Sequence, residues 1–141
     1  MKKLITLAMI LVWISSHAIN LNKISGSYQG NQGNYTCGVE LVESQKDSNV
    51  LILKIIDANG KASSKTKIKK DRFDKIKKLS DYEFNIVAKK GLFPGYNHIV
   101  NFQLNNDGQL SDLTISLGER LFFGDHFIIL GQNSCSNLSR K

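Results

Sequence analysis

The chain has 141 residues, of which 22% are charged, and a formal net charge of +7. This length supports one domain around one buried core. The chain contains a single proline and no linker or repeat, so nothing in its composition indicates a second domain. An excess of basic residues is typical of proteins that meet anionic partners.

Residues 1–18 have the three parts of a cleavable secretory signal peptide. Two lysines come first, residues 4–14 form an apolar core, and Ser16-His17-Ala18 is a small-x-small cleavage site. The apolar core is shorter than the roughly 20 residues that span a bilayer, and no second hydrophobic stretch follows. We therefore expect a secreted protein, periplasmic or extracellular and not membrane-spanning, with residues 19–141 as a single β domain.

Cys37 and Cys135 are the only cysteines, and both lie in the expected mature chain. Exported chains enter oxidising compartments, where thiols pair, so we predict a disulfide bond between them. The alternative is two free thiols that act as metal ligand or nucleophile. It is disfavoured because the chain has no Cys-x-x-Cys pair and no histidine close to either cysteine. We expect no metal and no cofactor.

The first half of the mature chain consists of short strands separated by Gly, Asn and Asp turns. Side chains alternate from residue 35, so Tyr35, Cys37 and Val39 share one face and Cys37 points inward. An apolar run and a polar strand form a hairpin around the turn at residues 57–60. The expected strands here are 26–30, 35–43, 50–56 and 65–70.

The period of the pattern changes in the segment 71–79. Phe73, Ile76 and Leu79 recur every three residues, and Asp71 precedes them as a possible N-cap, which predicts a short helix. Alternation then returns, with a loop at residues 91–95 and turns at 105–108 and 118–120. The expected strands of this half are 81–88, 96–104, 113–117 and 121–130.

About eight strands with short connections favour an all-β antiparallel meander. We expect it to close as a small β-barrel, because closure removes unpaired edges, with a β-sandwich as the alternative. The segment Ile24-Ser25-Gly26-Ser27-Tyr28 resembles the Gly-x-Trp opening of lipocalin-like (calycin) barrels, with Tyr28 in place of Trp. The resemblance implies a binding barrel rather than a catalyst, with Gly26 and Tyr28 in structural roles at the closed end.

Positive charge is concentrated in residues 61–90, which carry eleven basic and four acidic side chains. Strand alternation places Lys65, Lys67 and Lys69 on one face. Such a face attracts anionic lipid, envelope polymers or an acidic protein surface. The alternative is a solvated edge strand, on which lysines prevent aggregation. We expect no nucleic acid, because few aromatic residues accompany the lysines.

The loop after the fifth expected strand, residues 81–88, has an apolar tip, Leu92 and Phe93, behind the basic pair Lys89 and Lys90. This tip enters either a membrane surface or a partner's groove, or it folds inward and plugs one end of the barrel.

His98 lies on the apolar face of its strand beside Tyr96. It is either a buried, hydrogen-bonded histidine or, with Tyr96, a polar group in a hydrophobic ligand pocket. Asp125 and His126 are adjacent strand residues and point to opposite faces, so they do not form a dyad. No catalytic motif is present, and we expect no enzyme.

The leading hypothesis is therefore a basic, non-catalytic secreted or periplasmic binding protein for an anionic or amphipathic ligand such as a lipid or envelope polymer. The alternative is a secreted protein inhibitor or protein-interaction module.

Overall fold

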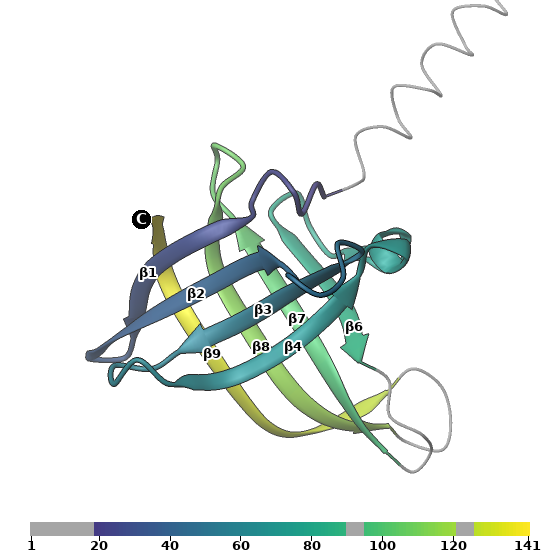
Figure 1. Ribbon diagram of the computed structural model, residues 1–141. Helices are drawn as coiled ribbons and strands as arrows, with labels where there is room; N and C mark the ends of the chain where they lie inside the picture. Colours follow the sequence, from purple (N-terminus) through teal and green to yellow (C-terminus); the bar gives the residue numbers. More distant parts are fainter. Residues whose placement is uncertain (1–18, 90–94, 121–125) are drawn as a thin grey trace, which may run out of the picture.

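The computed structural model describes residues 19–89, 95–120 and 126–141, which form one antiparallel sheet of nine strands (Figure 1). Among these residues, no helix combines the length and the apolar character needed to cross a membrane. The expected signal peptide at residues 1–18 lies outside the described residues. The elements are β1 (Gly26–Gln32), β2 (Tyr35–Glu43), β3 (Val50–Ile56), β4 (Ala62–Lys69), η1 (Lys70–Lys75), β5 (Lys77–Lys78), β6 (Glu83–Lys89), β7 (Tyr96–Leu104), β8 (Leu110–Arg120) and β9 (Phe127–Arg140).

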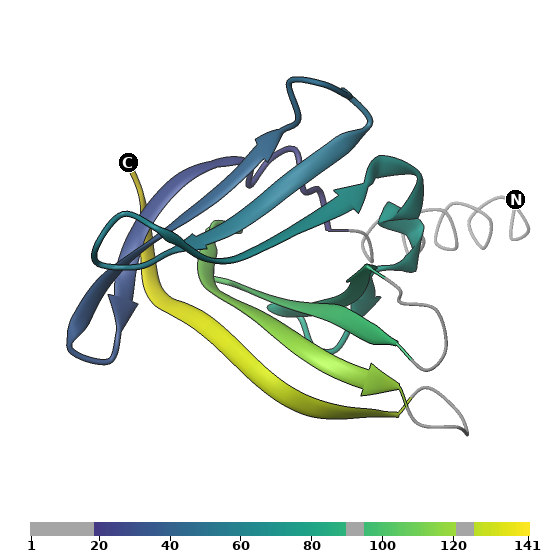
Figure 2. The same ribbon diagram turned by 60° about the horizontal axis from the view of Figure 1, so that its bottom comes forward.

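The strand order in the sheet is β4-β3-β2-β1-β9-β8-β7-β6-β5. Every pair of neighbours is consecutive in sequence except β1 and β9, the first and last strands, which pair with each other as they do in a closed up-and-down barrel. The sheet folds over on itself, so that β1–β4 face β6–β9 across the core (Figure 2).

The expected closed barrel is not formed, because no backbone hydrogen bonds join β4 to β5 or β6 in the described structure. The physical reason lies just after β4. The chain turns into the 3-10 helix η1, and β5 is only two residues long and pairs with β6. Side chains rather than backbone groups bridge the opening between β4 and the opposite half of the sheet. We call this opening the seam.

Strands 35–43, 50–56 and 96–104 have the predicted bounds. The predicted short helix near residues 71–79 is formed only in part. Its first part is the 3-10 helix η1, and Asp71 lies within it and provides no side-chain cap. Ile76 returns to an extended conformation and residues 77–78 pair with β6, so Leu79 is exposed rather than part of a helical stripe. The last strand is also longer at its C-terminal end than the predicted strand 121–130.

The core lies between the two halves of the sheet and follows the alternation of the strands. Cys37, Val39 and Leu41 of β2 are buried, as predicted for this face, but Tyr35 at the hairpin end is exposed. Other large, fully buried side chains are Leu51, Leu53, Ile55, Ile68, Ile86, Phe102, Leu110 and Leu113.

The predicted disulfide bond between Cys37 and Cys135 is present. It joins β2 to β9 and passes over β1, which lies between them, at Gly30. A Cβ atom at Gly30 would lie 2.8 Å from Leu138 Cδ2 and 3.3 Å from Cys135 Sγ, and closer still to the Ser136 carbonyl oxygen. Only glycine fits beneath the disulfide. The bond is consistent with an oxidising, extracytoplasmic compartment.

The start of β1 is fixed to the end of β9 by Arg140. Its guanidinium lies 5.3 Å from the ring centroid of the buried Tyr28 and donates a 3.0 Å hydrogen bond to the tyrosine hydroxyl. It also donates to the carbonyl oxygens of Lys23 and Ser25. The Tyr28 hydroxyl in turn donates to the Ile24 carbonyl oxygen at 2.5 Å. Burial raises the pKa of Tyr28, and the positive charge of Arg140 offsets part of that rise.

Candidate functional site: a cationic cavity at the seam

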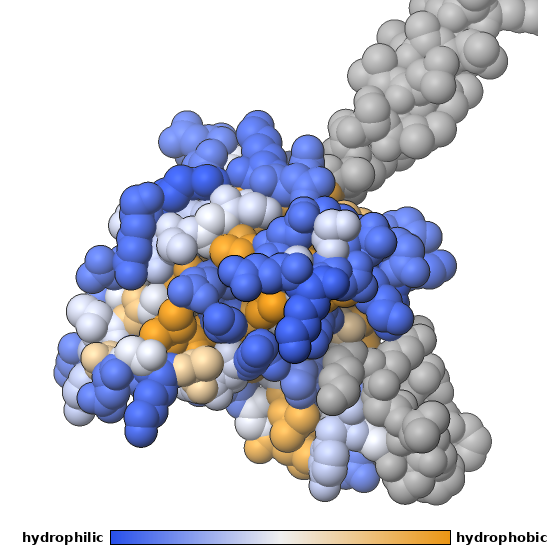
Figure 3. All heavy atoms as spheres, in the orientation of Figure 1, coloured by the Kyte–Doolittle hydropathy of each residue, from blue (hydrophilic) through white to orange (hydrophobic). Residues whose placement is uncertain are grey.

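The seam is bounded on one side by β4, an edge strand of the sheet. Its side chains alternate as predicted: Thr66 and Ile68 are buried, and the three lysines between and beside them are exposed. Figure 3 shows hydrophilic side chains gathered over this strand and the turn that follows it. The cationic ladder Lys65, Lys67 and Lys69 therefore exists as a continuous row along the seam.

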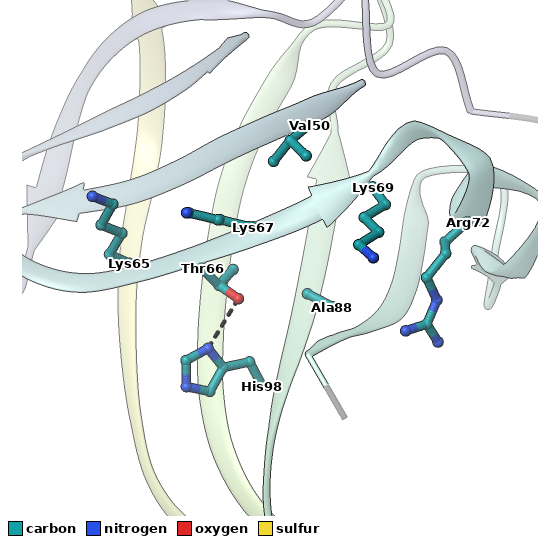
Figure 4. Close-up of a pocket in the computed structure, with 8 residues that line it drawn as sticks. All are labelled: Val50, Lys65, Thr66, Lys67, Lys69, Arg72, Ala88 and His98. Carbon is teal, nitrogen blue, oxygen red and sulfur yellow. Dashed lines mark hydrogen bonds between the residues drawn. The ribbon is translucent and has the colours of Figure 1, made fainter. Parts of the chain in front are cut away.

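A cavity of about 560 Å³ opens beside this row, where β4 and η1 face β6 and β7. Its lining combines basic, apolar and hydrogen-bonding side chains, drawn in Figure 4: Val50, Lys65, Thr66, Lys67, Lys69, Arg72, Ala88 and His98. In this view Lys69 and Arg72 extend together from β4 and η1 to the level of Ala88, whereas Lys65 and Lys67 extend toward β3.

Among the described residues, none of the four basic side chains of the cavity forms an ion pair with a carboxylate. Ion pairs join other basic residues to carboxylates, with distances of 3.2 Å for Lys54–Glu40 and 2.7 Å for Lys70–Glu43. Across residues 19–89, 95–120 and 126–141, no carboxylate oxygen lies within 4.0 Å of the basic nitrogens of this cavity. The cavity mouth therefore carries an uncompensated positive charge that attracts anions.

Two sets of side-chain hydrogen bonds hold the seam. His98 Nδ1 lies 2.9 Å from Thr66 Oγ1, so β7 is joined to β4 at the floor of the cavity. Asn133 of β9 donates to the Ser63 carbonyl oxygen at 3.2 Å and to Ser64 Oγ at 2.6 Å. A second cavity, of about 500 Å³, lies between these two bridges and shares Lys65 and His98 with the first.

The structure brings together only part of the predicted site. Lys65, Lys67, Lys69 and His98 line the cavity, but Tyr96 is 61% exposed and contributes to neither cavity among the described residues. The structure thus does not bring Tyr96 together with His98 in either of these cavities. The His98 side chain is half-buried. It is hydrogen-bonded to Thr66 and also lines the cavity, so it has features of both a buried, hydrogen-bonded histidine and a polar group in a pocket.

The basic, apolar loop lies largely outside the described residues. The backbone of Lys89 ends β6 and pairs with His98, but its side chain and the residues Lys90, Leu92 and Phe93 are not described. Asp125 also lies outside the described residues, so the argument against a dyad with His126 stays a prediction. A role for the loop in membrane or partner contact likewise stays a prediction.

Sequence reasoning missed four lining residues that come from separate elements: Val50, Thr66, Arg72 and Ala88. Thr66 had a signal, because it alternates with the lysines. Arg72 had none, because only the 3-10 turn of η1 returns it to the cavity. In the described part of the chain, no group of three or more His, Cys, Asp and Glu side chains has the arrangement of a metal site.

Comparison of the chain with known protein families, with curated proteins and with solved structures finds no match in any of the three. The resemblance to lipocalin-like barrels thus finds support only in the antiparallel β architecture. The geometry of the cavity is the basis for interpreting its function.

Proposed function

We propose that this protein is a non-catalytic, secreted or periplasmic binding protein for an anionic amphipathic ligand. The observation that carries the proposal is the cavity at the seam, in which uncompensated basic groups stand beside apolar and hydrogen-bonding side chains. The disulfide bond and the signal-peptide pattern support a site of action outside the cytoplasm.

The cavity has the size and mixed lining of small-molecule sites, which usually occupy about 300–1,000 Å³ and place a few polar groups on an apolar wall. Arg72 supplies a planar donor pair that matches the oxygens of a phosphate or carboxylate, and Lys69 adds a point charge beside it. Val50 and Ala88 provide apolar wall for the start of a hydrocarbon chain. A ligand with an anionic headgroup and an alkyl chain uses both kinds of surface.

A calorimetric titration with three probes tests the proposal. Dodecyl phosphate has both parts of the expected ligand, dodecyl maltoside has the chain without the charge, and inorganic phosphate has the charge without the chain. We expect dodecyl phosphate to bind most tightly, with an affinity that falls as salt is added, because screening weakens contacts between exposed charges.

The matched variants are Lys69→Glu with Arg72→Glu at the cavity and, as a control, Lys141→Glu at the exposed C-terminus. The cavity variant is expected to bind dodecyl phosphate at least tenfold more weakly, and the control to bind it like the unaltered protein. Equal affinity for the three probes, or equal binding by the cavity variant and the control, would contradict the proposal.

A further inference from the structure

The first half of β9 has a hydrogen-bonded neighbour on one side only. Strand β8 pairs with β9 from Phe127 to Cys135, whereas β1 pairs with it only at Ser136, Ser139 and Arg140. In the described structure, the residues Phe127–Gln132 therefore present an unpaired backbone edge, which we call the open β9 edge. It lies inside the strand order, apart from the terminal strands β4 and β5.

Apolar side chains flank the open β9 edge on both faces of the sheet. Ile128, Ile129 and Leu130 are 50%, 49% and 51% exposed, and successive strand residues point to opposite faces. Figure 3 shows an apolar area at the lower end of the molecule, over this part of β9. A partner that rests on one face would cover only some of these side chains. An added strand would cover those on both faces.

The composition of this edge differs from that of the other two. β4 carries Lys65, Lys67 and Lys69, and β5 consists of Lys77 and Lys78. Lysines on an edge strand oppose the addition of another strand, because the incoming chain has to desolvate them. From Phe127 to Ser139 the chain has neither a charged residue nor a proline. The open β9 edge thus lacks the lysines that oppose pairing at β4 and β5.

We propose that two copies of this chain pair through their open β9 edges, antiparallel and about a two-fold axis, into one continuous sheet. Antiparallel pairing makes the segment its own complement and consumes both edges, so that assembly stops at the dimer. Charge permits a second copy here. The segment brings no charge to the contact, so two molecules that each carry a net positive charge meet there without like-charge repulsion. No β9 residue lines the 560 Å³ cavity, so the inference is independent of the proposed function.

Sedimentation equilibrium of the purified, disulfide-bonded protein, from micromolar to near-millimolar concentration, tests this pairing. We expect a monomer–dimer equilibrium whose dissociation constant rises at least tenfold in Ile129→Lys and in Leu130→Lys, because a two-fold axis brings both new charges to the interface. Tyr35→Lys is the control. It makes the same kind of change at a 72% exposed residue of β2 and is expected to leave the constant unchanged.

Hydrogen exchange of the unaltered protein gives a second readout that does not depend on the folding of a variant. Dimer formation is expected to slow exchange of the amides of residues 127–132 as concentration rises, because half of them gain carbonyl partners. A protein that stays monomeric throughout this range overturns the proposal. So does a dimer that forms without protection of these amides, which would place the contact elsewhere.

Discussion

Removing the disulfide bond by the double substitution Cys37→Ala and Cys135→Ala is expected to destabilise the protein strongly. The bond closes a loop of 98 residues. The chain-entropy model gives a loss of about 16 cal/mol/K for a loop of this length, or about 4.7 kcal/mol at 25 °C. Small domains have total stabilities of about 5–15 kcal/mol, so the variant is left with a small margin.

The loss is expected to act mainly through the unfolded state. In the folded state β1 lies between the two cysteines, and it is held to β2 along its whole length and to β9 at three positions. These backbone pairs persist without the sulfur atoms. The unfolded chain, by contrast, is free to expand once the loop is opened.

Urea unfolding at equilibrium measures both effects. We expect the free energy of unfolding to fall by about 4–5 kcal/mol and the m-value to rise, because the uncrosslinked chain exposes more surface. The unaltered protein unfolded in the presence of a reductant should match the variant. A loss below about 2 kcal/mol with an unchanged m-value would refute the loop-entropy reasoning.

Three further predictions concern single side chains. Gly30→Ala is expected to cost about 1–3 kcal/mol in urea unfolding, because its methyl group has no room under the disulfide. Gly131→Ala, with no atom within 4 Å of the added carbon, should cost nothing, and equal losses would contradict the packing argument. Burial raises the pKa of Tyr28, so the unfolded state ionises first and stability should fall as pH rises through about 10. This fall should be smaller in Tyr28→Phe, and an identical alkaline profile would show that Tyr28 is not its source. Thr66→Val removes the hydrogen bond to His98 and is expected to cost about 1 kcal/mol by thermal unfolding, whereas an unchanged midpoint would mean that the bridge does not hold the seam.

The strands were predictable because their signals are local. Alternation in residues 96–104 and the Asn-rich turn after them specify a hairpin with no information from the rest of the chain. The mismatch at residues 76–79, where the expected helix is not continued, has the opposite cause. The apolar spacing there suits a helix, but β6 offers backbone partners to residues 77–78, and this tertiary pairing ends the helix after Lys75.

Closure of the barrel was not predictable from strand count, because it depends on whether two distant strands meet through their backbones. The seam is instead bridged by Thr66 with His98 and by Asn133 with two serines, and no sequence pattern marks these pairs. The residues of the candidate site likewise divide into those with a local sequence signal and those placed only by tertiary structure. The lysine row of β4 was visible from alternation, whereas Arg72 and Ala88 join it only after the sheet folds over.

The pairing of the first strand with the last has a consequence for the order of folding. As the chain is made from its N-terminus, β1 finds β2 at once, and each later strand except β5 pairs with the one before it. The remaining side of β1 has to wait for β9, and Cys37 for Cys135, across 98 residues. Contacts of such long range slow folding, because the entropy of closing the loop is lost before the contact forms. Folding of this protein thus reaches completion only when its last strand has been made, and a nascent chain halted before Cys135 holds an unpaired β1 edge and a reactive thiol.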